Sequence, residues 1–294
     1  MRFRDRLVMA LLAAIWGASF LFQRDAAPEF GPLALVQVRI SVAAAFLLAI
    51  VVLRGQVRQL RSHVGAMVVL GAISTLVPFC LFTYATLSIT AGFASVLNAT
   101  APLFAAVIGW LWLRESLSRL RSLGVAVGFA GVVILVSPKL ALSGENAAIA
   151  AGLLASTCYG LSGHFSRHKL KGVAPLVLTC GSQIGASLML LPFSITHWPA
   201  ASPSGWSWGC AIVLGVVCTG TAYALYFQLV ERVGAASAIV VTYLIPVFGI
   251  LWGSLFRAEP VTPPMLLGTG VILAGTILVT GFRPSGSGSQ LLKK

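Results

Sequence analysis

The chain has very little charge for its length. Only 9% of its 294 residues are Asp, Glu, Lys or Arg, whereas an ordinary soluble domain has about 25%. Hydrophobic residues make up 58% of the chain, and the mean hydropathy is +0.95. This composition excludes a water-soluble globular domain and is typical of an integral membrane protein.

Acidic residues are scarcest, and none falls in the middle of an apolar segment. The seven acids lie in predicted loops or at predicted helix ends: Asp5, Asp25, Glu29, Glu115, Glu145, Glu231 and Glu259. No buried carboxylate is therefore available for a proton relay. We expect the substrate to move down its own gradient or by exchange, without an obligatory proton on an acidic side chain.

Catalytic and metal-binding patterns are also missing. The five cysteines lie in apolar segments without C-x-x-C spacing, which favours small packed side chains over a metal site or a disulfide framework. Ser162 and His164 are close in sequence, but no acid in the membrane can orient the histidine. The sequence predicts no enzyme activity, no metal and no cofactor.

Long apolar stretches fill the rest of the chain. A helix needs roughly 17 to 25 apolar residues to cross a membrane. Ten such stretches are found, at residues 7–23, 33–53, 64–86, 91–113, 120–138, 147–166, 175–195, 208–230, 235–256 and 264–282. They lack the alternation of barrel strands. We predict an all-α integral membrane protein with ten transmembrane helices.

The second half of the sequence repeats the first. At an offset of 144 residues, Gly71, Pro102, Gly109 and Glu115 fall on Gly215, Pro246, Gly253 and Glu259. At an offset of 143, Trp16-Gly17-x-Ser19 falls on Tyr159-Gly160-x-Ser162. Each copy holds five spans, an odd number, so the copies are inverted in the membrane, as in many secondary transporters. The predicted domains are residues 1–139 and 147–283, and residues 284–294 form a flexible tail of the kind that an expression vector leaves.

Basic residues mark one membrane face. Most of the 20 Lys and Arg residues lie on the side of the N-terminus, and only Arg24, Lys139 and Arg257 lie in the opposite loops. The positive-inside rule then places both termini in the cytoplasm, and we expect the bacterial inner (plasma) membrane. The net charge of +13 does not indicate nucleic-acid binding, because the basic residues are dispersed over short loops.

These patterns together resemble the drug/metabolite transporter superfamily, specifically its EamA family. The resemblance is carried by Trp16-Gly17-Ala18-Ser19-Phe20, by Arg39, by the block from Thr90-Ala91 through Pro102-Leu103 to Arg114-Glu115 and Gly124, and by a second block from Gly234-Ala235 through Ile245-Pro246 to Glu259 and Gly268. Within the family, the chain is most similar to amino-acid exporters of the YddG type. The resemblance implies ten helices around a central cavity and a small metabolite moved by alternating access. The second copy departs from the first, with Tyr159 for the Trp and Ser182 where Arg39 would be.

Prolines lie inside the predicted spans. Pro78, Pro102 and Pro246 are expected to kink helices and serve gating, because a proline frees the carbonyl four residues earlier. Pro102 frees the carbonyl of Asn98 and Pro246 frees that of Thr242, at matching positions of the two copies. We expect them to meet near the bilayer centre and bind substrate; the alternative is a bend whose carbonyl a nearby Ser or Thr satisfies.

Aromatic residues are paired across the repeat in the same way. Trp16 pairs with Tyr159, Phe79 pairs with Tyr223, and Tyr243 completes the set. Buried Trp and Tyr side chains need hydrogen-bond partners, which a solvated cavity supplies. These five residues are therefore expected to contact substrate, and the alternative is ordinary helix packing.

Arg39 is the one ionisable residue clearly inside a predicted span. Its distance from the span's outer end, about six residues, allows the side chain to snorkel to the interface. The sequence thus favours a structural role, in which Arg39 caps backbone carbonyls, over contact with a substrate carboxylate.

Glycines line one side of the fifth and tenth spans, at Gly124, Gly128 and Gly131 and at Gly268, Gly270 and Gly275. Small residues let helix backbones approach closely. We interpret them as a seam between the two copies rather than a dimer face, and we expect a monomer or a weak dimer.

The leading interpretation is a transporter of small zwitterionic metabolites, chiefly amino acids with bulky apolar or aromatic side chains. A cavity without a basic cluster suits a neutral zwitterion better than a phosphate. The alternative is an exporter of lipophilic drugs or organic cations, which usually presents a buried acid to its cargo. The expected partners are the small-molecule substrate and membrane lipid, with no nucleic acid.

The charge distribution makes a testable prediction about topology. Residues 54–63 and 167–171 should be cytoplasmic, and residues 139–146 and 197–206 should face outward. Single cysteines in these segments, in a background without native cysteines, can be labelled on intact cells with an impermeant thiol reagent. Labelling of the first two segments from outside would contradict the topology.

Overall fold

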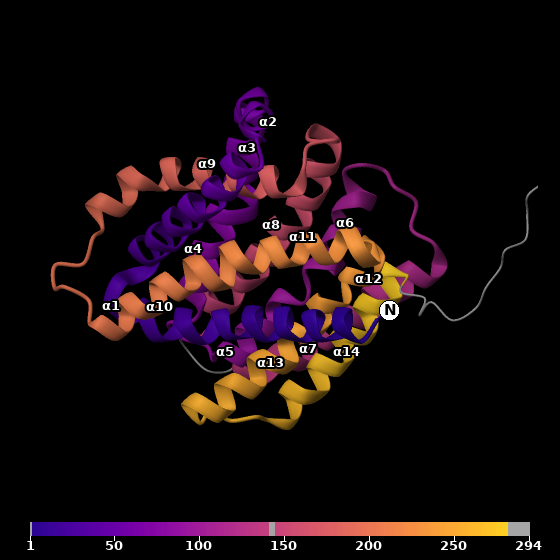
Figure 1. The fold of residues 1–294 in the computed structure, drawn as a ribbon. Coiled ribbons are helices and arrows are strands. Elements are labelled where there is room, and N and C mark those ends of the chain that lie inside the picture. The colour runs from indigo at the N-terminus through magenta and orange to yellow at the C-terminus, as the bar shows by residue number, and fades with distance from the viewer. Residues whose placement is uncertain (1, 141–144, 282–294) are drawn as a thin grey trace, which may run out of the picture.

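The computed structural model describes residues 2–140 and 145–281 (Figure 1). Every regular element in these two ranges is helical. The predicted tail at residues 284–294 lies outside the described residues.

The helices of the first copy run in chain order from α1 to α7. They are α1 (Phe3–Leu53), α2 (Val57–Ser62), α3 (Val64–Gly71), the π-helical turn η1 (Ala72–Leu76), α4 (Val77–Ala85), α5 (Ala91–Asn98), α6 (Ala101–Leu111) and α7 (Arg119–Leu140). The second copy contains α8 (Asn146–Lys169), α9 (Pro175–Thr196), α10 (Gly205–Gly215), the π-helical turn η2 (Val216–Thr221), α11 (Ala222–Val233), α12 (Ala235–Ala238), α13 (Val240–Arg257) and α14 (Pro263–Thr280).

These elements combine into ten membrane spans. Eight helical segments of the described chain are long and apolar enough to cross a membrane. One of them, α1, has 51 residues, twice the usual requirement, and provides two spans. Helix α8 has 24 residues and is long enough, although it is more polar than the others. The fold class expected from the sequence is confirmed.

The two spans of α1 meet at a bend around Gly31. Gly31 has φ 71° and ψ 162°, a conformation that glycine adopts readily and that the following Pro32 favours by excluding helical geometry. In Figure 1 the indigo helix runs from the N-terminus to this bend and returns towards α2. Glu29 accepts hydrogen bonds from the backbone N–H and the hydroxyl of Ser204, which lower the pKa of its carboxyl. This contact ties the bend to the start of α10.

The two copies interlock through equivalent backbone contacts. A Cβ atom on Gly17 would lie 2.8 Å from the backbone nitrogen of Gly249, and one on Gly160 would lie 2.7 Å from that of Ala105. Gly17 and Gly160 are repeat partners, and so are Gly249 and Ala105. Each copy therefore presses its first span against the fourth span of the other copy, as an inverted repeat requires.

The third span of each copy contains a π-helical turn, and the turns lie at matching positions. η1 starts at Ala72 and η2 at Val216, an offset of 144. Pro78 is the second residue after η1, where a wider turn relieves the clash that its ring would cause. The second copy has no proline there; instead the Thr219 hydroxyl donates to the carbonyl of Leu214.

The predicted glycine seam is present between α7 and α14, except at Gly270, where nothing lies within 4 Å of a Cβ atom. A Cβ atom on Gly131 would lie 2.7 Å from the backbone nitrogen of Ile272, and one on Gly275 would overlap the backbone of Gly128. The two helices thus touch backbone to backbone, and the seam joins the fifth and tenth spans within one chain.

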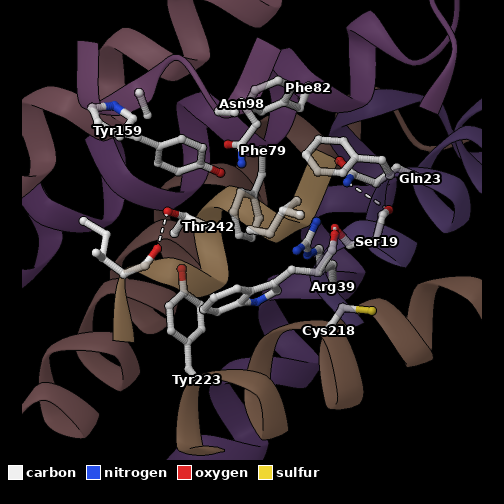
Figure 2. Close-up of a pocket in the computed structure, with 17 residues that line it drawn as sticks. Ser19, Gln23, Arg39, Phe79, Phe82, Asn98, Tyr159, Cys218, Tyr223 and Thr242 are labelled. Carbon is white, nitrogen blue, oxygen red and sulfur yellow. Dashed lines mark hydrogen bonds between the residues drawn. The ribbon is translucent and has the colours of Figure 1, made fainter. Parts of the chain in front are cut away.

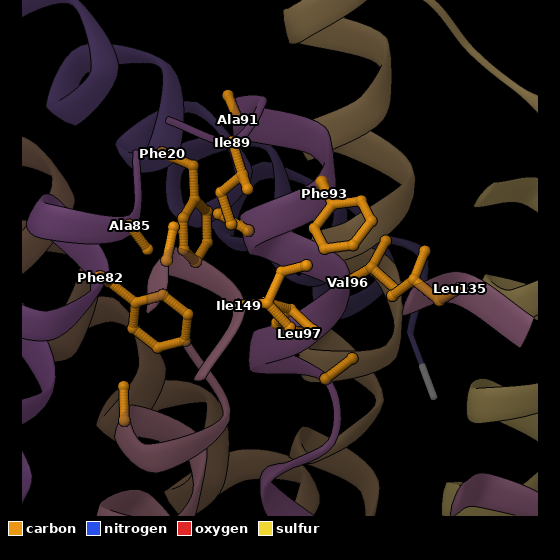
Figure 3. Packing of buried hydrophobic residues seen from close by; sticks show 14 of the residues in the cluster. Phe20, Phe82, Ala85, Ile89, Ala91, Phe93, Val96, Leu97, Leu135 and Ile149 are labelled. Atoms are coloured by element: carbon orange, nitrogen blue, oxygen red, sulfur yellow. The ribbon is translucent and has the colours of Figure 1, made fainter. Parts of the chain in front are cut away.

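The ends of the molecule differ in packing. The end away from the basic residues is filled by the cluster in Figure 3, whose labelled members are Phe20, Phe82, Ala85, Ile89, Ala91, Phe93, Val96, Leu97, Leu135 and Ile149. Glu259 lies at the same end, where its carboxylate accepts the backbone N–H groups of Ala91 and Gly92 at 2.9 and 3.2 Å and pairs with Arg24 at 3.3 Å. A carboxylate at a helix N-terminus is favourably placed. Its repeat partner at the basic end, Glu115, has a side chain that is 45% exposed.

The seam can be tested with two glycines of α14. Gly275→Leu should lower the free energy of unfolding by at least about 3 kcal/mol, because the new side chain has to displace the backbone of Gly128. Gly270→Leu is the matched control, since nothing lies within 4 Å of a Cβ atom on Gly270. Thermal unfolding in detergent would measure both, and equal melting temperatures would contradict the seam.

The two glutamates make a second matched pair. Glu259→Gln should destabilise the protein by roughly 1.5 to 3 kcal/mol, because hydrogen bonds to a buried charged acceptor are lost or weakened. Glu115→Gln should cost less, since that carboxylate is half-exposed. The two variants can be compared by thermal unfolding. A loss for Glu115→Gln as large as the loss for Glu259→Gln would contradict the stabilising role of Glu259.

Candidate functional site: a central cavity between the two copies

A cavity of about 260 Å³ lies where the two copies meet. Its walls come from α1, α4, α5, α6, α8 and η2, together with α11 and the start of α13. Figure 2 shows Tyr159, Tyr223 and Thr242 on one side and Ser19, Gln23 and Arg39 on the other. The site is built from spans of both copies, so it depends on their inverted packing.

Six of the seven residues predicted to contact substrate line this cavity: Trp16, Phe79, Asn98, Tyr159, Tyr223 and Thr242. Tyr243 does not line it. The Tyr243 side chain is buried elsewhere, and its hydroxyl pairs with that of Thr280 on α14. Adjacent residues of a helix point in different directions, so only Thr242 of this pair can face the cavity.

The aromatic rings form two groups on the cavity wall. Trp16 packs edge-on against Tyr223, with ring centroids 5.7 Å apart, and Tyr159 stacks on Phe82 at 6.1 Å. Phe82 was not predicted. Phe82 lies three residues after Phe79 on the same helix, and this spacing places both side chains on one face. The spacing could therefore have predicted Phe82 from Phe79.

The first copy breaks its fourth span beside the cavity. Helix α5 ends at Asn98, and α6 begins at Ala101 with Pro102 in its first turn. The carbonyl of Leu97 accepts hydrogen bonds from the hydroxyls of Thr100 and Ser156, at 2.6 and 2.8 Å. The break leaves Asn98 and Pro102 on the cavity wall.

The second copy breaks at a different point. Helix α13 runs unbroken through Pro246, and the interruption lies at Ile239, between α12 and α13. The Thr242 hydroxyl donates to the carbonyl of Ile239 at 2.7 Å. The proline predicted to kink this span does not interrupt the helix, and Thr242 and Ile239 line the cavity.

Arg39 lines the cavity instead of capping carbonyls at the membrane edge. The residue is 5% exposed. Its Nε–H donates to the Thr219 hydroxyl at 3.0 Å, and its guanidinium carbon lies 4.0 Å from the centre of the Phe79 ring. No carboxylate of the described residues pairs with it within 4.0 Å. The predicted capping role is corrected: a buried cation faces the cavity.

The structure also corrects which residue is equivalent to Arg39. Gln183 lies 144 positions after Arg39, and its Nε2 donates to the Thr75 hydroxyl at 3.4 Å. Thr75 is the repeat partner of Thr219. In each copy, a side chain of the second span therefore bonds to a threonine in the π-helical turn of the other copy: Arg39 bonds to Thr219, and Gln183 bonds to Thr75. Gln183, not Ser182, is the counterpart of Arg39.

At the end away from the basic residues, polar contacts join the helices beside the cavity. Gln23 is 3% exposed, and its Oε1 accepts the Thr83 hydroxyl at 3.0 Å. Arg24, next in the chain, donates to the carbonyl of Ile89 at 2.6 Å and pairs with Glu259. These contacts hold α1, α4 and the start of α5 together above the cavity.

Ser162 and His164, which are close in sequence, make separate contacts. Ser162 donates to the carbonyl of Tyr159, and His164 bonds to the carbonyl of Ala105, so the two side chains serve separate helix contacts. Within the described ranges no three His, Cys, Asp or Glu residues are grouped as metal ligands. Among the described residues, the lining of the cavity offers one cation, hydroxyl and amide groups, and aromatic faces.

Comparison with known proteins finds similarity to transporters. The model of the EamA-like transporter family matches residues 6–137 and 146–281. An uncharacterized transporter of Archaeoglobus fulgidus is 25% identical over 93% of this chain and 97% of its own length. A probable terminal-alkyne amino-acid exporter of Streptantibioticus cattleyicolor is 24% identical over 92% of this chain and 91% of its own length. A crystal structure with 16% identity superposes with a TM-score of 0.67 over 95% of this chain and 98% of the other, which shows a shared fold.

Proposed function

Because the chain belongs to the EamA-like transporter family, we propose that it is a secondary transporter for small zwitterionic metabolites. The substrates are amino acids, including those with bulky apolar or aromatic side chains. They move by alternating access through the central cavity, across a bacterial inner membrane, with the basic face in the cytoplasm.

The observation that carries this proposal is the unpaired guanidinium of Arg39. A buried charge is costly unless it is paired and hydrogen-bonded. The described contacts of Arg39, to Thr219 and to the face of Phe79, include no anion. A substrate carboxylate would supply the missing charge, and the planar guanidinium can bind it through two hydrogen bonds.

The rest of the cavity suits the other parts of an amino acid. Aromatic faces attract an ammonium group and also bury a large apolar side chain. Asn98 and Thr242 add amide and hydroxyl oxygens as hydrogen-bond acceptors. The relationship to a probable terminal-alkyne amino-acid exporter supports the same substrate class.

The same observation disfavours the alternative cargo. An organic cation would meet the positive charge of Arg39 in a low-dielectric cavity, where like charges repel strongly. No carboxylate among the described cavity residues offsets that repulsion. For the same reason we propose transport by exchange or down the substrate gradient, without a proton carried on an acidic side chain.

The proposal can be tested in proteoliposomes loaded with a panel of amino acids. We expect counterflow of L-phenylalanine to be inhibited better by L-phenylalanine than by 3-phenylpropionate, which lacks the ammonium group, or by phenethylamine, which lacks the carboxylate. Arg39→Gln should weaken transport by about tenfold or more, because a hydrogen bond to a charged group contributes roughly 1.5 to 3 kcal/mol.

Two further comparisons sharpen the test. Gln at position 39 should allow folding, because Gln183 occupies the equivalent position of the second copy. Trp16→Ala should impair L-phenylalanine more than L-alanine, since the lost contact is apolar area. The proposal fails if no amino acid in the panel exchanges, or if Arg39→Gln reaches the membrane and transports at the wild-type rate.

A further inference from the structure

A second, smaller pocket adjoins the central cavity on the side of the basic face. Its volume is about 220 Å³, and its walls come from α3, η1, α8, α9 and α11. Tyr223 borders both the central cavity and this pocket. Phe227 stacks on Tyr223. Phe227 and Pro175 line both this pocket and a third pocket, whose wall includes Arg54 and Glu231. The three spaces follow one another from the middle of the protein towards the basic face.

The second pocket is the repeat counterpart of the Arg39 side of the central cavity. Arg39 corresponds to Gln183, and Cys218 corresponds to Ser74, at an offset of 144. Ser19 corresponds to Ser162 at an offset of 143. The two half-sites therefore share a framework, but the one charged side chain is replaced by a neutral amide.

Five hydroxyl groups on the wall of this pocket already act as hydrogen-bond donors to backbone carbonyls. Ser74 donates to the carbonyl of Leu70 at 2.7 Å, and Thr179 donates to that of Pro175 at 3.1 Å. Ser162, Ser166 and Ser182 donate in the same way to carbonyls three residues earlier in their own helices. A hydroxyl that donates to its own helix keeps its lone pairs as acceptors. These oxygens therefore offer acceptors to a ligand.

Gln183 adds an unused acceptor to the pocket. The residue is 1% exposed and lines the pocket, and its Nε2 donates to Thr75. Its Oε1 is buried and has no hydrogen-bond partner. A buried carbonyl without a donor is costly, and a ligand that brings N–H donors would satisfy it.

We propose that this pocket is a second substrate site, which binds the ammonium group of an amino acid passing between the central cavity and the basic face. The proposal rests on the proposed transport of amino acids and adds a station to their route. Arg39 in the central cavity holds the carboxylate end of the substrate, and the acceptors around Gln183 hold its ammonium end as it crosses Tyr223.

The site can be probed by thiol chemistry at Ser166, which lies on the pocket wall. In Ser166→Cys without native cysteines, the rates of modification by a trimethylammonium and by a sulfonate methanethiosulfonate reagent are compared. Gln183→Glu should raise the ratio of the cationic to the anionic rate by about tenfold, because it adds a negative charge beside the pocket. Both oxygens of Glu are acceptors, so this result does not depend on how the amide of Gln183 is oriented. L-Phenylalanine and phenethylamine should slow the modification, and 3-phenylpropionate should not.

Transport supplies the second readout. Gln183→Leu should reduce L-phenylalanine counterflow by about tenfold and abolish protection by phenethylamine. Gln37→Leu is the matched control. Gln37 is also buried with an unpaired Oε1, but it lies outside the central cavity and the second pocket. Counterflow of L-phenylalanine by this variant should stay within about twofold of wild type.

The outcomes separate the two proposals. If the wild-type protein exchanges no amino acid, the proposed function fails, and protection of Ser166→Cys by phenethylamine still reports on the pocket. If exchange is normal but Gln183→Leu retains both transport and amine protection, the second site is overturned. Gel filtration of Gln183→Glu and Gln183→Leu verifies that both variants are folded.

Discussion

Close backbone contact between the two copies is the constraint on which the rest of this structure depends. In a membrane, apolar side chains gain little by leaving lipid, so helices associate mainly through tight packing. Here Gly17 and Gly160 bring each first span against the fourth span of the other copy, and Gly275 meets Gly128 along the seam. These contacts fix ten helices around a cavity that neither copy could form alone. A side chain at any of these glycines would move the walls of the cavity.

Much of this architecture could be predicted from the sequence, because it follows from pattern. Apolar length gave the spans, and the repeat of 144 residues gave the equivalence of Asn98 and Thr242. Depth in the span placed Trp16 and Tyr159 at the cavity. Two features depended on local geometry instead. The Tyr243 side chain, next to Thr242, points away from the cavity, and the interruption between α12 and α13 lies at Ile239, where no proline marks it. The sequence alone does not show at which residue a helix is interrupted when no proline or glycine marks the position.

The roles of Arg39 and Gln183 were hidden for a related reason. The π-helical turns shift the register of the third spans, and only the folded chain shows that Thr75 and Thr219 receive these two side chains. No proline in the sequence marks η2. There the Thr219 hydroxyl donates to the carbonyl of Leu214. One copy therefore presents a cation and the other an amide from the same framework. The two copies share the backbone framework, and the difference between Arg39 and Gln183 gives the two halves different charge.

The lone charge of Arg39 also has an electrical consequence. The guanidinium belongs to the protein, so it does not cross the membrane with the cargo. A zwitterion that pairs with it brings no net charge of its own, and its complete passage would move no charge through the membrane potential. A singly charged substrate would gain or lose roughly 2.3 kcal/mol for every 100 mV. A cavity whose described lining residues include one cation and no carboxylate therefore fits a carrier whose flux follows concentration and is indifferent to voltage.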